Sequence, residues 1–163
     1  GADAVVLPGV GNFQLASRSL GPLRSEIAGM VEGGVPLLGV CLGMQLFFEA
    51  SEEGPGEGLA LLKGRVLRMP EDVKTPHMGW NTIKILRSSD ILDGIDDGDH
   101  FYFAHSYFAR PVDEHITLAE TRYGLSFPSA VAEGNLYGVQ FHPEKSGLPG
   151  ERVLRNFARI VKR

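Results

Sequence analysis

Residues 35–45 read "VPLLGVCLGMQ" and place the only cysteine of the chain, Cys41, between two glycines directly after an apolar run. The run "VPLLGV" (35–40) predicts a strand buried on both faces, and residues 42–51 predict a helix. A nucleophile on a sharp strand-to-helix turn requires small neighbours that keep the backbone clear of the substrate. The stretch therefore predicts an α/β fold with Cys41 on a sharp turn at the carboxyl end of a buried strand, where a nucleophile would be placed.

Taken alone, this motif leaves two interpretations of Cys41 open. The positive end of a helix starting near Leu42 favours the thiolate over the free-cysteine pKa of about 8.5. A lone cysteine at the end of a buried strand, however, commonly serves packing only. A catalytic role requires partners elsewhere in the chain.

The segments before residue 60 alternate between strand and helix. "DAVVLPG" (3–9) predicts a second strand buried on both faces. Residues 13–31 show helical spacing interrupted by Pro22, which is compatible with one kinked helix or two short ones. Residues 52–58, "EEGPGEG", predict an exposed loop.

The chain changes character after residue 60. Short segments rich in β-branched and aromatic residues, separated by turn signals, predict strands, many of them antiparallel. Residues 149–163 predict an amphipathic closing helix. This order predicts a single α/β domain over residues 1–163, a sandwich with a mixed sheet.

Composition excludes several classes of function. The net charge of −4 and the absence of a long basic cluster argue against nucleic-acid binding. No run approaches the roughly 18 apolar residues of a membrane span. One cysteine cannot form an internal disulfide, which favours a reducing, cytoplasmic location.

A general base for the thiol is offered by "GVQFHPEKSG" (138–147). Residues i and i+2 of an extended segment point to the same side, so Glu144 can accept a hydrogen bond from His142 and fix its tautomer. The combination with Cys41 follows the nucleophile, base and acid arrangement of the hydrolase triads. The alternative is an ordinary surface turn.

A tetrahedral intermediate also needs backbone N–H donors for its oxyanion. The amide of Leu42 can supply one, and the turn "PGVGN" (8–12) can supply another at the end of the neighbouring strand. We expect that donor to be Val10, because Gly9 and Gly11 allow the peptide to turn inward.

With these pieces assembled, the chain resembles the triad-type (class I) glutamine amidotransferases. Within that family the pattern is similar to the glutaminase subunits of imidazole glycerol phosphate synthase, an enzyme of histidine biosynthesis. The resemblance covers nearly the whole chain and implies a three-layer α/β sandwich with a mixed, largely parallel central sheet and an antiparallel strand-rich portion. Five motifs carry it in order: "LPGVGNF" (7–13), "GVCLGMQLFFEAS" (39–51), "PHMGWN" (76–81), "YFAHSY" (102–107) and "GVQFHPEKSG" (138–147).

The resemblance implies a role for each matching residue. Cys41 would form a γ-glutamyl thioester from L-glutamine, with His142 as general base and acid and Glu144 orienting it. Gln45 matches a residue that contacts the substrate, as do Ser106 and Tyr107, and the turn at Gly9 and Gly11 borders the same site. No cofactor is implied.

The family also implies a partner, a (β/α)₈-barrel cyclase subunit that receives ammonia in a heterodimer. Trp80, Asn81 and Lys145 match positions near that interface. Family members begin with a further strand and helix before the segment matching "GADAVVLPG" (1–9), roughly 30 or more residues by the usual size of such units. We expect that unit to be missing from the sequence given.

Three alternatives stay open at this point. The chain could be the glutaminase of another synthase or a stand-alone γ-glutamyl thiol hydrolase, although "PHMGWN" argues against both. It could be an inactive scaffold subunit, although Cys41, His142 and Glu144 are all present. The third is a metal site formed by His77, His100, His105 and His142. It is disfavoured, because only His100 and His105 have a ligand-like spacing, and these two bracket a predicted strand and fall on opposite faces.

Overall fold

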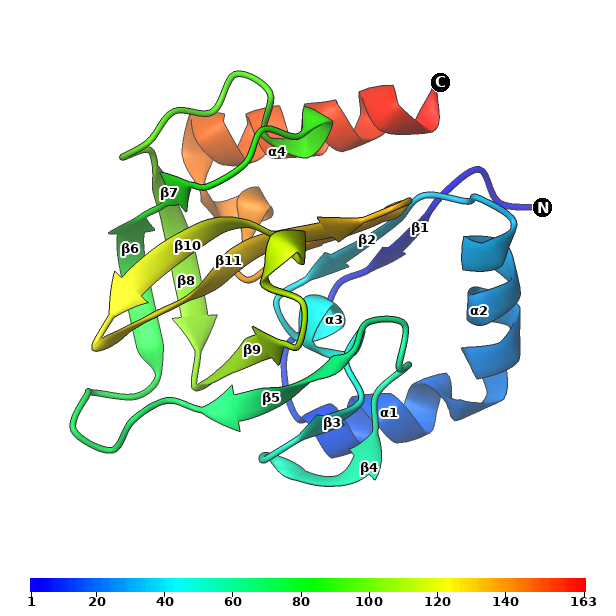
Figure 1. The fold of residues 1–163 in the computed structure, drawn as a ribbon, viewed down its shortest axis with the longest axis horizontal. Coiled ribbons are helices and arrows are strands. Elements are labelled where there is room, and N and C mark those ends of the chain that lie inside the picture. Colours follow the sequence, from blue (N-terminus) through cyan, green and yellow to red (C-terminus); the bar gives the residue numbers. More distant parts are fainter.

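The computed structural model describes residues 1–163, and its main sheet is built around the quoted stretch (Figure 1). Strand β2 (Leu37–Val40) lies between two parallel neighbours, β1 (Val5–Leu7) and β12 (Leu136–Val139). The mixed character of the sheet is confirmed, since the rest is antiparallel, in the order β1-β2-β12-β11-β10-β7. The remaining strands are β11 (Leu125–Glu133), β10 (Thr117–Tyr123) and β7 (Lys84–Ile85).

Two smaller sheets pack beside the main one. The first has the order β4-β3-β5-β9, and the second is the antiparallel pair of β6 and β8. Their bounds are β3 (Ala50–Ser51), β4 (Gly54–Glu57), β5 (Gly64–Arg68), β9 (Tyr107–Pro111), β6 (His77–Thr82) and β8 (His100–His105). The expectation of a plain loop over 52–58 was wrong, because β3 and β4 form an antiparallel hairpin there.

The helix expected over 42–51 is also much shorter than predicted. Helix α3 spans only Leu42–Gln45. The backbone carbonyls of Leu46, Phe47 and Phe48 accept hydrogen bonds from residues 59–62 instead of continuing the helix, and both phenylalanines are fully buried. Tertiary pairing therefore overrides the local helical pattern.

The region around Pro22 forms two helices rather than one kinked helix. Helix α1 (Phe13–Leu20), capped by the side chain of Asn12, is followed by a 3₁₀ turn (Gly21–Leu23) and by α2 (Arg24–Glu32). The closing helix α4 (Gly147–Val161) is present as expected. Three further 3₁₀ turns are η2 (Asp90–Leu92), η3 (Glu114–Ile116) and η4 (Pro143–Lys145).

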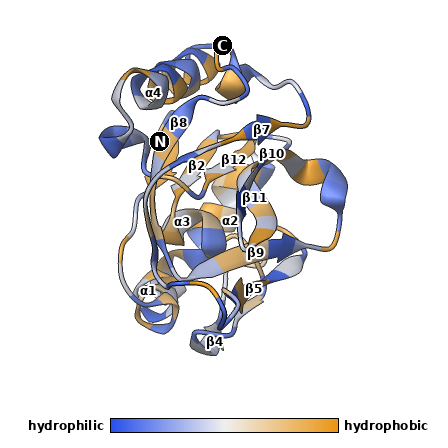
Figure 2. Ribbon diagram, turned by 90° about the vertical axis from the view of Figure 1, so that its left-hand side faces the viewer, coloured by the Kyte–Doolittle hydropathy of each residue, from blue (hydrophilic) through white to orange (hydrophobic).

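The main sheet separates two hydrophobic cores. Leu38 of β2 belongs to the core that includes Phe157 of α4, whereas its neighbour Leu37 belongs to the core with Ile27 of α2 and Met44 of α3. Hydrophobic residues dominate the central strands, while α4 shows one apolar and one polar side (Figure 2). These layers form the three-layer sandwich. Strand β1 departs from the expectation of complete burial, because Val6 is 49% exposed.

None of the helices in this fold has the length and apolar composition that a membrane crossing needs.

Candidate active site

Cys41 sits on a strained turn between β2 and α3. Its backbone has φ 56° and ψ −110°, and Ala60 is the only other non-glycine residue with positive φ. Such a conformation costs on the order of 1–3 kcal/mol and persists only where the surroundings hold it. The nucleophile-elbow geometry expected from the sequence is therefore present.

The two glycines around Cys41 have a different purpose from the one expected. A Cβ on Gly39 would come within 2.7 Å of the backbone of Gly43 and Met44. A Cβ on Gly43 would come within 1.8 Å of the carbonyl oxygen of Leu7 in β1. The glycines thus let the elbow pack against itself and against β1, rather than clearing space for a ligand.

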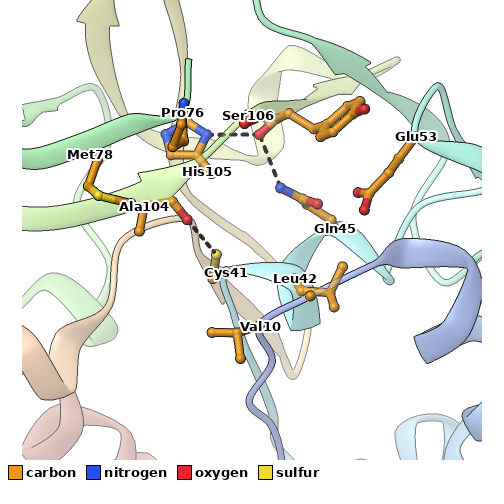
Figure 3. A pocket seen from close by; sticks show the side chains of 12 residues that line it. Val10, Cys41, Leu42, Gln45, Glu53, Pro76, Met78, Ala104, His105 and Ser106 are labelled. Atoms are coloured by element: carbon orange, nitrogen blue, oxygen red, sulfur yellow. Dashed lines mark hydrogen bonds between the residues drawn. The ribbon is translucent and has the colours of Figure 1, made fainter. Parts of the chain in front are cut away.

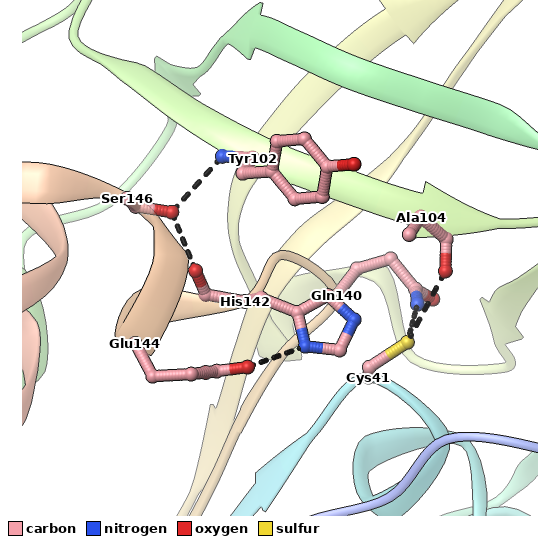
Figure 4. A network of polar contacts seen from close by, with 7 residues as sticks. All are labelled: Cys41, Tyr102, Ala104, Gln140, His142, Glu144 and Ser146. Carbon is pink, nitrogen blue, oxygen red and sulfur yellow. Dashed lines mark hydrogen bonds and ion pairs between the residues drawn. The ribbon is translucent and has the colours of Figure 1, made fainter.

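His142 and Glu144 form the expected acid–base pair. Nδ1 of His142 lies 2.7 Å from Oε1 of Glu144, and Nε2 is buried without a hydrogen-bond partner. The imidazole lies between Glu144 and Cys41 (Figure 4). The reason for the pairing differs from the expected one: His142 caps the 3₁₀ turn η4, so the two residues meet across a turn and not along an extended strand.

A hydroxyl holds the backbone of this turn. Oγ of Ser146 donates to the carbonyl of His142 at 2.6 Å and accepts from the backbone N–H of Tyr102 in β8 at 2.9 Å. The base is thereby tied to β8, whose Ala104 and His105 line the opposite side of the thiol.

The thiol of Cys41 is not the ready thiolate that its position at a helix start suggested. Burial raises its pKa to about 11, and this outweighs the lowering by the backbone N–H of Leu42 and by the side chain of Gln140. Helix α3 has only four residues, so its field is weak. Sγ contacts the carbonyl oxygen of Ala104 at 3.7 Å and Nε2 of Gln140 at 3.5 Å.

A cavity of about 250 Å³ opens beside Cys41 (Figure 3). This volume suits a small metabolite rather than the ligands of larger pockets of about 300–1,000 Å³. The residues expected at the site that line it are Val10, Gly11, Cys41, Leu42, Gln45, Ser106 and Tyr107. Gly9 does not line it, but a Cβ there would lie 3.1 Å from Cβ of Leu42.

Other lining residues were not anticipated from the sequence. They are Glu53, Pro76, Met78, Ala104 and His105. The carboxylate of Glu53 lies beside Gln45 in the cavity wall (Figure 3) and accepts a hydrogen bond from the backbone N–H of Phe13 at 3.2 Å. Burial raises its pKa. It lies in the segment taken for a loop, so no periodic pattern marked it.

The side chain of Gln45 is buried and doubly bonded through its nitrogen. Nε2 donates to the carbonyl of Tyr107 at 3.1 Å and to Oε1 of Gln140 at 3.1 Å. Its Oε1 is left as the atom that can accept from a ligand.

Two buried histidines are paired at the cavity wall, which His105 lines and which His77 does not reach. Nδ1 of His77 lies 2.9 Å from Nε2 of His105, and Nδ1 of His105 lies 2.8 Å from the carbonyl oxygen of Tyr107. Burial lowers the pKa of His77 to about 4 and that of His105 to about 3. Both imidazoles are therefore neutral at pH 7.

Two of the residues expected at a partner interface, Trp80 and Asn81, lie on opposite faces of β6, and the third, Lys145, lies in η4. Trp80 is 57% exposed and makes an edge contact with Tyr102, over whose ring Lys145 also lies. Asn81 points to the other face, where its Nδ2 donates to the Arg122 carbonyl at 3.1 Å and lies 3.2 Å from Nε2 of His77. The geometry favours a structural role for Asn81.

No group of three or more histidine, cysteine, aspartate or glutamate side chains is arranged to hold a metal ion.

Comparison with known proteins gives a consistent picture. The family model described as "Glutamine amidotransferase class-I" matches residues 2–161. The imidazole glycerol phosphate synthase subunit HisH of Methanocaldococcus jannaschii is 45% identical over 160 residues, covering 98% of this chain and 81% of that protein. The subunit of the same name from Archaeoglobus fulgidus is 51% identical over 164 residues, covering 99% and 81%.

Solved structures agree on the fold. A protein from Thermoplasma acidophilum that is described as part of a GMP synthase superposes with a TM-score of 0.75 at 22% identity, over 99% of this chain and 74% of that one. A structure described as a glutamine amidotransferase gives the same TM-score at 23% identity, over 100% and 81%.

Proposed function

The chain belongs to the class-I glutamine amidotransferases, in the group of the HisH subunits, and from this premise we propose that it hydrolyses L-glutamine to glutamate and ammonia. The observation that carries the proposal is the strained Cys41 turn facing the hydrogen-bonded pair of His142 and Glu144. A thiol, a base and an orienting carboxylate in this order are what acyl transfer through a thioester requires.

The chemistry begins with the thiol proton. It passes to Nε2 of His142, which has no competing partner, while Glu144 stabilises the resulting imidazolium through Nδ1. The sulfur attacks the carboxamide carbon, and His142 returns the proton to the departing ammonia. A water molecule, activated by the same imidazole, then hydrolyses the γ-glutamyl thioester.

The oxyanion formed in each step needs two donors. The backbone N–H of Leu42 follows the nucleophile directly and already acts on the sulfur. Val10, which lines the cavity beside Leu42, is the second candidate, with Gly11 at φ 112° next to it.

The free amino-acid end of glutamine meets a polar wall. Glu53 and Oε1 of Gln45 are acceptors suited to an α-ammonium group, and the half-buried segment of Ser106 and Tyr107 lies next to them. A carboxylate partner favours the charged amine by roughly 1.5–3 kcal/mol.

Ammonia released here would serve a second subunit. We propose a one-to-one heterodimer with a (β/α)₈-barrel cyclase, together a cytoplasmic lyase that makes imidazole glycerol phosphate for histidine biosynthesis. The relatives' name, which describes one component of a synthase, supports an assembly with a partner. Trp80 and Lys145 are exposed and both contact the half-buried ring of Tyr102, and this aromatic and basic surface suits docking.

The decisive experiment measures glutamate release from L-glutamine by the chain alone and with a cyclase partner plus its nucleotide ligand. Cys41→Ala is the blank. We expect strong stimulation by the partner and no activity in Cys41→Ala.

Two other results would contradict the proposal in different ways. High activity without any partner would indicate a stand-alone hydrolase. No activity in either state, with a folded chain, would indicate a scaffold subunit.

A further inference from the structure

Gln140 is a fully buried polar residue that the chemistry above does not use. It follows β12 directly, two residues before His142, and none of its surface is exposed. Its backbone N–H is satisfied by the carbonyl of Ser129 at 2.9 Å, which fixes the position of the residue. Its side-chain amide reaches Sγ of Cys41 at 3.5 Å (Figure 4).

A series of hydrogen bonds that begins at the backbone carbonyl of Tyr107 decides which atom of the Gln140 amide faces the sulfur. The carbonyl oxygen of Tyr107 can only accept, so the group of Gln45 that faces it must be the NH₂. The second hydrogen of that NH₂ points at Gln140, so the atom of Gln140 that faces it must be the oxygen. The remaining atom of the Gln140 amide, which faces sulfur, is therefore the nitrogen, a donor.

The other groups around Sγ of Cys41 show why the N–H donor of Gln140 is important for a thiolate. The neighbouring carbonyl of Ala104 at 3.7 Å can accept from a thiol but offers nothing to a thiolate. Among side chains, Gln140 is the one that donates to the sulfur. The charged and titratable groups around it are His142, Glu144 and Lys145 from the turn after β12, with His105 and Glu53 on the cavity wall.

We propose that Gln140 is a catalytic residue that stabilises the Cys41 thiolate through the N–H donated by its side-chain amide. When the thiol proton moves from Sγ to Nε2 of His142, the new negative charge on sulfur gains this donor at the position where the amide is already held. Gln45 and the Tyr107 carbonyl are positioning groups for the donor. The catalytic role of Gln140 rests on the proposed function, whereas the hydrogen bond from its amide to Sγ of Cys41 does not depend on that function.

The test uses the chain's only cysteine as its own reporter. Thiolate, and not thiol, reacts with alkylating reagents, so the alkylation rate at a fixed pH below the thiol pKa follows the thiolate fraction. Rates are measured for wild type, Gln140→Met and Gln140→Leu with iodoacetamide and with the larger N-ethylmaleimide. Thr121→Val is the matched control, because it removes a buried donor that lies 2.9 Å from the Thr82 carbonyl, in a strand that contributes no residue to the cavity lining.

We expect both Gln140 variants to react about three- to fourfold more slowly at each pH below the thiol pKa. A rise of about one unit in that pKa lowers the thiolate fraction about tenfold, while the more basic thiolate is about threefold more nucleophilic. The reduction should be equal for the two reagents, and Thr121→Val should react like wild type. Unchanged rates in folded variants would overturn the proposal. Unequal reductions for the two reagents would also overturn it, because they would indicate altered access rather than altered ionisation.

Failure of this inference is distinguishable from failure of the proposed function. Alkylation needs no glutamine, so a slower Gln140 variant supports the role of the donor even if the wild type releases no glutamate. Glutamate release by the wild type with unchanged alkylation in the variants keeps the function and removes Gln140 from it.

Discussion

Glu53 brings a negative charge to the cavity wall beside Gln45, and a backbone N–H at the start of α1 holds it in place. We predict that Glu53→Gln raises the KM for glutamine by roughly tenfold or more while changing kcat much less, because a charge-assisted hydrogen bond to the α-ammonium is lost. Steady-state glutamate release with the partner present measures both constants. A lowered kcat with unchanged KM would contradict this binding role.

His77 and His105 are held neutral in the interior, below the ordinary pKa of 6.5. An unfolded chain binds protons at these residues as the pH falls, whereas the folded chain does not until about pH 4 for His77 and about pH 3 for His105. Their contribution to stability is therefore complete above pH 6.5 and is lost as the pH falls toward those values.

We predict a loss of about 2 kcal/mol per histidine in the free energy of unfolding between pH 7 and about pH 5. Urea unfolding at the two pH values measures it. In His77→Gln the loss in the free energy of unfolding between the two pH values should be smaller by about 2 kcal/mol, the contribution of one histidine. His115→Gln, which removes an exposed histidine, should keep the wild-type dependence.

At the scale of elements, the contact between α3 and β1 depends on the absence of a single carbon atom. A Cβ at Gly43 would meet the Leu7 carbonyl at 1.8 Å, so the elbow and β1 would have to separate. We predict that Gly43→Ala lowers the free energy of unfolding by about 3 kcal/mol or more.

The matched control is Gly29→Ala within α2, where an added Cβ would meet nothing within 4 Å. It should stabilise the chain by roughly 0.5–1 kcal/mol, since alanine loses less backbone freedom in a helix. Chemical unfolding of both variants provides the comparison, and an unaltered Gly43→Ala would show that the elbow is not tightly packed.

The local sequence pattern could predict those elements whose buried residues recur at one regular spacing, either that of a helix or that of a strand. Strand β2 and helix α4 carry such patterns and appear where expected. Residues 46–58 were assigned wrongly because their carbonyls bond to residues 59–62 and to a hairpin partner, contacts that no local pattern encodes.

The site divides in the same way. Cys41, His142 and Glu144 could be predicted from the sequence. The glycines around Cys41 indicate a sharp turn, and the two-residue spacing of His142 and Glu144 indicates a hydrogen-bonded pair. Gln140 and Glu53 could not, since their importance arises only when β12 and the hairpin are folded against the elbow.

At the scale of the whole molecule, we predict that a second subunit binds at the exposed side of β6. Trp80 contacts Tyr102 only at its edge and contributes little to the core, so we predict that Trp80→Ala leaves the melting temperature nearly unchanged. The affinity of the Trp80→Ala variant for the cyclase subunit should fall by roughly tenfold or more, because tryptophans often supply much of the binding energy of an interface.

Titration calorimetry with the partner measures this loss. Val112→Ala removes part of another exposed apolar side chain, at the distant end of β9, and should bind normally. Equal affinities for wild type and Trp80→Ala would place the interface elsewhere.

The pairing of β2 with β12 has a consequence for the newly made chain. Cys41 leaves the ribosome well before β12 and His142, which follow it in the chain. A chain interrupted before that point carries a thiol with no base and a central strand missing one neighbour. Translation products that stop before His142 are therefore expected to lack glutaminase activity, and glutamine is consumed only by molecules whose synthesis has passed β12 and His142.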